Sequence, residues 1–311
     1  MSPIPAEVAS ATGYELGEGP IWDAERERLL WVDIAEGLVL SGRLVGDRVE
    51  VDEVRRFPST VAAAVPSADD GLLVALRGGL ATVAADGTIR TGAPVLPEGV
   101  ESRFNDGACD PAGRFLVGSM ALDDREHDER LYRVDGAGSV AVVDDSLTLS
   151  NGLGWSPDGR TLHHVDSVPG IVWSRTYDPG TGAMGPRRQH LLVDDATPDG
   201  LCVDVDGNLW IAIHGAGEVR CFDPDGAQLA TVEVGAPQPT SVAFVGPDRD
   251  RLLITSAREG LSPAELDEHP WSGHLFLADV GTRGVPTTAW AGRCADITGP
   301  DDPRQPAEPA P

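Results

Sequence analysis

The chain has 311 residues, with 24 basic against 50 acidic side chains and a formal net charge of −26. This balance excludes a nucleic-acid-binding protein, which would need clustered basic residues, and no run of about 18 apolar residues is available for a membrane span. Hydrophobic residues make up 41% of the chain, as in ordinary globular proteins. Met1 to Leu16 has no basic start and no long apolar stretch. We therefore expect a cytoplasmic protein with reduced cysteines.

Six similar segments follow one another along the chain. Each begins with a polar or small residue, continues into an apolar strand, turns, and returns in a second apolar strand. The segments begin near Glu18, Val61, Asn105, Asn151, Asp199 and Thr240. Their spacing of roughly 40–50 residues is that of a propeller blade.

Turn residues punctuate these segments. Asp70-Gly71, Asp158-Gly159 and Asp206-Gly207 are pairs that favour the positive φ of hairpin turns. Short strands with regular turns and no amphipathic helix predict an all-β fold, a six-bladed β-propeller. We expect one domain over residues 1–298, whose first residues add an outer strand to the last blade. The Pro-rich acidic tail 299–311 is predicted to be disordered.

Repeat symmetry predicts where the polar residues meet. Equivalent positions of the innermost strands lie at one height around the axis, so Glu18, Asn105, Asn151 and Asp199 should face one mouth of the channel. In the third segment, the alignment with the other segments is ambiguous, so that either Asn105 or Asp106 could occupy the equivalent position. An all-oxygen set suits calcium, magnesium or manganese, whereas zinc more often recruits His or Cys. The alternative is that these residues only cap turns.

Other polar residues have two interpretations each. Arg103 either binds substrate oxygens bidentately or forms a surface ion pair. Asp123, after a predicted strand, either reaches over the mouth or is a solvated loop acid. The cysteines and histidines fit structural roles, and no GxSxG motif indicates a serine hydrolase.

Several stretches in fixed order carry a family resemblance. They are LGEGPIWD, WVDI, SRFNDGACDPAGRFLVGSM, LSNGLGWSPDG, VDS, PDGLCVDVDGNLWIA and PWSGHLFLADV. With these stretches, the chain from about Tyr14 to about Val280 resembles the regucalcin (senescence marker protein)/gluconolactonase family of six-bladed propellers. Residues 121–130 depart from it, being short and charged where relatives often carry a longer lid.

The resemblance implies a function and a site. It implies a metal-dependent lactonase that opens a sugar-acid lactone, such as an aldonolactone, to the free acid. Glu18, Asn151 and Asp199 match the metal ligands, and Asp199 is the candidate general base. The implied metal is one divalent cation: calcium foremost, with zinc, manganese, magnesium or iron as alternatives.

The resemblance also implies substrate contacts and leaves alternatives open. Arg103, Asn105 and Asp123 match substrate-contacting positions, and Asp106, which follows in the same motif, is a candidate to lie behind the metal ligands and support them. Competing functions are a calcium- or ligand-binding regulatory propeller, and a metal-dependent esterase or organophosphate hydrolase. The expected partner is a small-molecule lactone, and we expect the protein to bind neither nucleic acid nor a membrane. It is expected to be a monomer or a homodimer.

Overall fold

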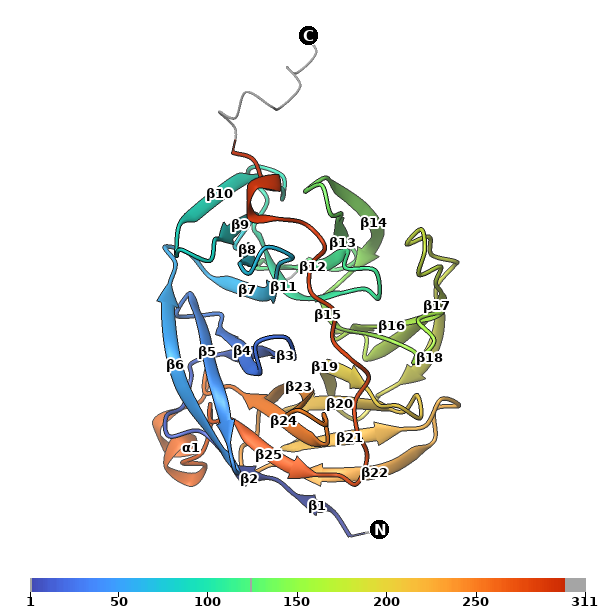
Figure 1. The fold of residues 1–311 in the computed structure, drawn as a ribbon. Helices are drawn as coiled ribbons and strands as arrows, with labels where there is room; N and C mark the ends of the chain where they lie inside the picture. Colours follow the sequence, from blue (N-terminus) through green and yellow to red (C-terminus); the bar gives the residue numbers. More distant parts are fainter. Residues whose placement is uncertain (1, 124, 300–311) are drawn as a thin grey trace, which may run out of the picture.

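Six sheets arranged around one axis make up the fold (Figure 1). The structure, a computed structural model, describes residues 2–123 and 125–299. Residues 300–311 of the tail predicted to be disordered lie outside this range. The all-β six-bladed propeller predicted from the repeats is confirmed.

The strands of each sheet follow one another outward from the axis in chain order. The first three blades contain β3 (Gly17–Asp23), β4 (Arg28–Asp33), β5 (Leu38–Val45) and β6 (Arg48–Arg56); β7 (Val61–Pro66), β8 (Leu72–Leu76), β9 (Gly79–Val83) and β10 (Ile89–Pro94); and β11 (Ser102–Cys109), β12 (Phe115–Ala121), β13 (Glu129–Val134) and β14 (Val140–Leu147). The last three contain β15 (Ser150–Trp155), β16 (Thr161–Asp166), β17 (Ile171–Thr176) and β18 (Arg188–Leu192); β19 (Thr197–Val203), β20 (Leu209–His214), β21 (Glu218–Phe222) and β22 (Gln228–Glu233); and β23 (Pro239–Val245), β24 (Arg251–Ser256) and β25 (Phe276–Asp279). A short helix, α1 (Pro263–Glu268), lies between β24 and β25, and the 3₁₀ turn η1 (Cys294–Asp296) follows them.

The N-terminal residues close the ring. β2 (Glu7–Val8) pairs antiparallel with β25 as the outer strand of the sixth blade, as predicted. β1 (Ile4–Pro5) pairs parallel with β22 and gives the fifth blade an additional strand, which was not predicted.

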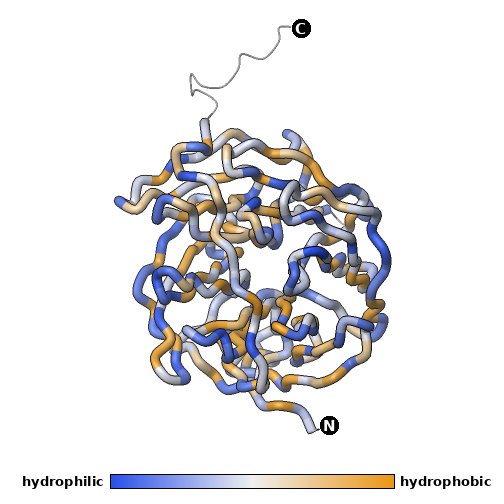
Figure 2. The backbone as a smooth tube through the Cα atoms, turned by 45° about the vertical axis from the view of Figure 1, so that its right-hand side comes forward, coloured by the Kyte–Doolittle hydropathy of each residue, from blue (hydrophilic) through white to orange (hydrophobic). Residues whose placement is uncertain are grey.

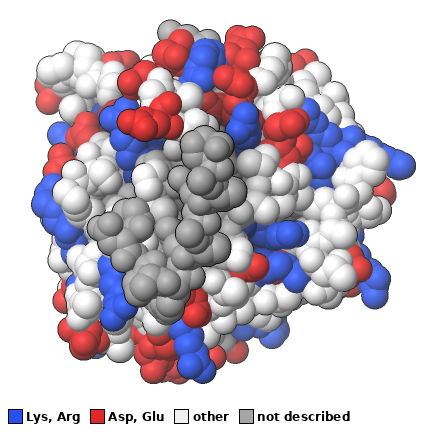
Figure 3. All heavy atoms as spheres, turned by 90° about the horizontal axis from the view of Figure 1, so that it is seen from above, with Lys and Arg blue, Asp and Glu red and all other residues white. Residues whose placement is uncertain are grey.

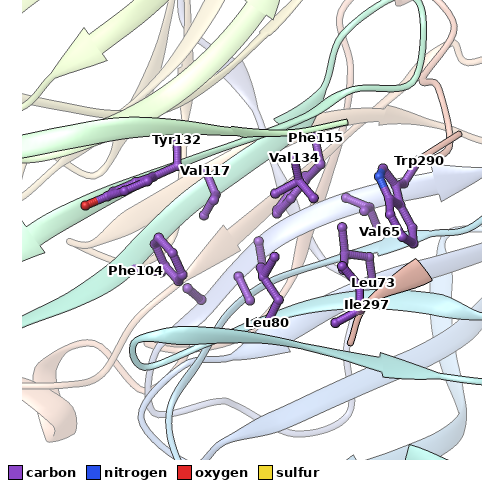
Figure 4. Packing of buried hydrophobic residues seen from close by; sticks show 13 residues of the cluster. Val65, Leu73, Leu80, Phe104, Phe115, Val117, Tyr132, Val134, Trp290 and Ile297 are labelled. Carbon is purple, nitrogen blue, oxygen red and sulfur yellow. The ribbon is translucent and has the colours of Figure 1, made fainter. Parts of the chain in front are cut away.

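Apolar side chains fill the spaces between neighbouring blades, and hydrophobic strand segments alternate with hydrophilic stretches along the backbone (Figure 2). One cluster joins the second and third blades (Figure 4). In it, the rings of Phe104 and Tyr132 meet edge to face with centroids 5.6 Å apart. These interfaces hold the innermost strands at fixed positions around the axis.

A register shift recurs in every innermost strand. In β11, β15 and β19, two residues oppose one residue of the next strand, so that each strand carries a β-bulge. Asn105, Asn151 and Asp199 are each the first residue of that bulge, which identifies Asn105 rather than Asp106 as their equivalent. Glu18 pairs with Val32 just before the bulge of β3, one position earlier than the repeat pattern predicts.

A segment that we call the C-terminal strap, residues 280–299, runs back across the blades (Figure 1). Gly284 bridges to Asp204 of the fifth blade, and Trp290 bridges to Ser67 of the second. A cavity of about 390 Å³ is lined both by strap residues, among them Val285, and by Asp106 of the third blade. The strap bridges to Ser67 and Asp204, which directly follow innermost strands, whereas the predicted metal ligands lie near the beginnings of such strands. The strap therefore covers the end of the channel opposite the predicted mouth.

Two surface properties bear on the predicted partners. None of the helices within the described residues has the length and apolar character needed to cross a membrane. On the face seen in Figure 3, arginine and acidic side chains are interspersed.

Candidate functional site

The predicted polar residues come together at the bulges of four innermost strands. We call Glu18, Asn105, Asp106, Asn151 and Asp199 the oxygen ring. Each of these residues is buried, with an exposed fraction of no more than 8%. Charge interactions connect Glu18 with Asp199 and Asp106, and Asp199 with Asp106. Residues from the first, third and fifth blades therefore share one buried site.

The three carboxyl groups of the oxygen ring are shifted toward their protonated forms. Burial, followed by repulsion from Asp199 and Asp106, raises the pKa of Glu18 well above its usual range. Burial and repulsion from Asp106 do the same to the pKa of Asp199. Burial raises the pKa of Asp106 to about 6, although the Gly107 amide donates to its Oδ1 at 2.7 Å. Such a group of carboxylates favours a bound cation.

The two amides of the oxygen ring have different freedom. Asn105 uses both ends of its side chain: Oδ1 accepts from Arg103 Nη1 at 2.8 Å, and Nδ2 donates to the Ser150 carbonyl at 3.1 Å. Asn151 Nδ2 donates to Ser167 Oγ at 3.1 Å. Its buried Oδ1 accepts no hydrogen bond from the described residues. Asn151 therefore offers an oxygen to a ligand, whereas Asn105 orients Arg103.

Arg103 lies half-buried beside the oxygen ring. Its Nη1 also donates to the Phe104 carbonyl at 2.9 Å, while Nε and Nη2 donate to none of the described residues. Burial lowers the pKa of Arg103, opposed first by Glu259 and then by Glu18 and Asp199. The guanidinium thus keeps donors free for a ligand.

Glu259 is the charged residue that sequence reasoning missed. It lies in the loop after β24, outside the repeat pattern. Its amide donates to the Glu15 carbonyl at 2.9 Å, close in sequence to Glu18. A repeat comparison cannot find such a residue, because no other segment has an equivalent loop.

Asp123 is not gathered into the oxygen ring. Its Oδ1 accepts from Arg125 Nε at 2.6 Å on an exposed loop, and this ion pair lowers the pKa of Asp123. None of the charge interactions of the oxygen ring within the described residues involves it.

The ligand set predicted for a metal mixes two carboxylates with one amide. Within residues 2–123 and 125–299, no group of three His, Cys, Asp or Glu side chains forms a metal cluster. The sixth blade adds only hydroxyls, of which Thr240 Oγ1 already donates to the Gly17 carbonyl at 2.5 Å. The polar atoms available to a cation are thus those of Glu18, Asn151 and Asp199, with Asp106 beside them.

Comparisons with known proteins identify the family of the chain. A family model described as SMP-30/Gluconolactonase/LRE-like region matches residues 16–258. The chain is 34% identical to regucalcin of Danio rerio over 298 residues, covering 94% of this chain and 100% of that protein. It is 34% identical to pentonolactonase XacC of Haloferax volcanii over 284 residues, covering 88% of this chain and 94% of the relative.

A solved structure is also similar. The crystal structure of a calcium-binding protein, regucalcin, from Agrobacterium tumefaciens superimposes with a TM-score of 0.87 at 28% identity, covering 93% of this chain and 99% of that one. Relatives named as sugar lactone hydrolases are thus found together with regucalcins. On the family match and these relatives, the chain belongs to the SMP-30/gluconolactonase/LRE-like family.

Proposed function

We propose that this protein hydrolyses a sugar-acid lactone to the open acid, with a divalent cation held by Glu18, Asn151 and Asp199. The observation that carries this proposal is the buried Oδ1 of Asn151, which accepts no hydrogen bond from the described residues, in the same site as two carboxyl groups whose pKa values are raised. An orphaned buried acceptor is costly, and a cation would satisfy it while neutralising the carboxylates. Relatives named as lactonases support the substrate class.

The donor set fits a hard cation. Carboxylate and amide oxygens are the ligands that calcium and magnesium prefer, and calcium is our first choice. Three protein ligands leave coordination positions for water and substrate. When bound, the cation would polarise the lactone carbonyl and stabilise the developing oxyanion.

The protein's own residues handle water and substrate. Asp199 accepts the proton of the water that attacks the lactone carbonyl carbon. The bond from that carbon to the ring oxygen breaks, and the proton passes to the departing alkoxide, so that the product is a hydroxy acid. Arg103, oriented by Asn105, holds substrate oxygens through its free Nε and Nη2 donors. Asp123 remains a candidate substrate contact.

Proton release from gluconolactone and pentonolactones tests this function. Chelated protein, protein refilled with calcium, manganese or zinc, and Asp199→Ala would be compared, with spontaneous ring opening subtracted. We expect acceleration that requires the metal and that falls by at least about 100-fold in Asp199→Ala. Asp195→Ala is a matched control, because Asp195 is exposed and paired with Arg220.

The same experiment separates the alternatives. Calcium binding by calorimetry without acceleration of any lactone would move the assignment to a calcium- or ligand-binding regulatory propeller. Turnover of aryl esters or organophosphates but not lactones would move it to a different hydrolase.

A further inference from the structure

Arginines near the third-blade side of the mouth are already paired with carboxylates. The backbone carbonyl of Arg77 accepts a hydrogen bond from the amide of Phe104, the residue after Arg103. The Nη2 atom of Arg77 lies 3.0 Å from a carboxylate oxygen of Glu101. Arg125 Nη2 donates to Ser102 Oγ, and its Nε lies 2.6 Å from an Asp123 oxygen. An anionic group entering here would have to displace these carboxylates.

The sixth-blade side repeats this arrangement. Arg258 Nε lies 3.6 Å from a Glu15 oxygen. The next residue, Glu259, is exposed, and its negative charge raises the pKa of Arg103 against the effect of burial, as Glu18 and Asp199 also do. Arg103 forms no ion pair within 4 Å with a described carboxylate, so the charge of Glu259 acts on it from more than 4 Å away.

The backbone fixes Glu259 in this place. Ala257 bridges to Leu16, and the amides of Arg258 and Glu259 both donate to the Glu15 carbonyl, at 3.0 and 2.9 Å. Ser262 then caps α1 with a capping box that involves Glu265. The loop carrying Glu259 is therefore tied at both ends, next to the strand that carries Glu18.

We propose that Glu259 is a specificity-determining residue that offsets the charge of Arg103, so that the mouth accepts uncharged lactones and rejects lactones carrying a phosphate or carboxylate. This inference rests on the proposed lactonase function. With a divalent cation bound and the three carboxylates of the oxygen ring ionised, the cation and Arg103 would balance their charge, and Glu259 would leave the mouth negative. The same charge would speed release of the product, which gains a carboxylate when the ring opens.

Charge-matched substrates test the proposal. The metal-loaded full-length protein and Glu259→Gln would be assayed on an aldonolactone and on the same lactone with a terminal phosphate. We expect Glu259→Gln to raise kcat/KM for the phosphorylated lactone about 3- to 10-fold, as removal of one charge several ångströms away implies. The neutral lactone should change less than about twofold, because Coulomb attraction acts only on a charged substrate.

Glu268→Gln on α1 is the matched control, since it removes the same charge from the same exposed region. Added salt should also weaken the discrimination more in the wild type than in Glu259→Gln, because exposed charges are screened. A substrate ratio unchanged in Glu259→Gln would overturn the proposal. So would an equal rise in Glu268→Gln, or an equal loss on both substrates.

Product binding separates this inference from the function. If the wild type opens no lactone, the proposed function fails. Calorimetric titration with an aldonate then still tests the charge role, with affinity expected to rise about 3- to 10-fold in Glu259→Gln and not in Glu268→Gln. Equal aldonate affinities in the three proteins would overturn it.

Discussion

Ser167 helps to orient the side chain of Asn151. Asn151 Nδ2 donates to Ser167 Oγ, which leaves Oδ1 directed away from that partner. Groups that orient a metal ligand typically affect affinity 10- to 100-fold. We therefore predict that Ser167→Ala lowers calcium affinity about 10-fold in a calorimetric titration.

A second serine of the same blade provides the comparison. Ser156 Oγ donates to Asp158 Oδ1 in an exposed turn. Ser156→Ala should leave calcium affinity unchanged. Equal affinities for Ser167→Ala and the wild type would show that Asn151 is not a ligand, or that Ser167 does not orient it.

The residues that gather in the oxygen ring were predictable where repeat symmetry holds. Asn151 and Asp199 occupy equivalent bulge positions, so one pattern predicts both. Glu18 lies one position earlier, directly before Gly19, whose φ of 53° is a left-handed conformation that the repeat pattern does not reveal. Glu259 and the Arg125 partner of Asp123 depend on loop contacts that no local pattern predicts.

At the level of elements, hairpins were more predictable than single short strands. Asp-Gly pairs mark the turn after the innermost strand in three blades, and the repeated apolar pattern marks the strand itself in all six, so all six innermost strands follow from the sequence. β1 has only Ile4 and Pro5, too few residues to show alternation. The strap was missed because its partly buried Val285 and its buried Trp290 and Ile297 are scattered among Gly, Pro and Thr.

The strand β16 places two histidines in the fourth blade. Burial lowers the pKa of His163 to about 4, with a further contribution from His190, and lowers that of His164 to about 3. His164 Nε2 lies 2.8 Å from Ser150 Oγ, beside the oxygen ring. Both imidazoles are therefore neutral in the folded protein near neutral pH.

This neutrality predicts a pH dependence of stability. The unfolded chain binds protons at His163 below about pH 6.5, whereas the folded chain does not until about pH 4, so stability falls as the pH drops through this window. The loss due to His163 at pH 5 is about 2 kcal/mol. Urea unfolding at pH 5 and 7.5 should show a smaller pH difference for His163→Gln than for the wild type. An identical difference would contradict the assignment.

Over the whole molecule, the strap binds blades that are distant in sequence. Trp290 is fully buried against Val65 and Leu73, and its Nε1 donates to the Asp135 carbonyl at 2.9 Å (Figure 4). Removing such a side chain leaves a large cavity. We predict that Trp290→Ala lowers the free energy of unfolding by about 3–5 kcal/mol.

The control is a tryptophan without that packing. Trp271 is 49% exposed, and Trp271→Ala should change stability much less than Trp290→Ala. Because the strap covers the channel away from the oxygen ring, folded Trp290→Ala should retain its calcium affinity. A loss of affinity at temperatures where the variant is folded would contradict this separation.

The closure of the sixth blade has a consequence for synthesis of the chain. Glu7 and Val8 lie opposite Leu277 and Phe276, so β2 cannot meet its partner until β25 has left the ribosome. Each of the first five blades has its four consecutive strands in a single stretch of chain and can form earlier from local hairpins. During translation the finished blades therefore form an open arc, and the apolar faces of its first and last blades stay exposed until the sixth blade is complete. These apolar faces are the surfaces that chaperones would have to shield from aggregation.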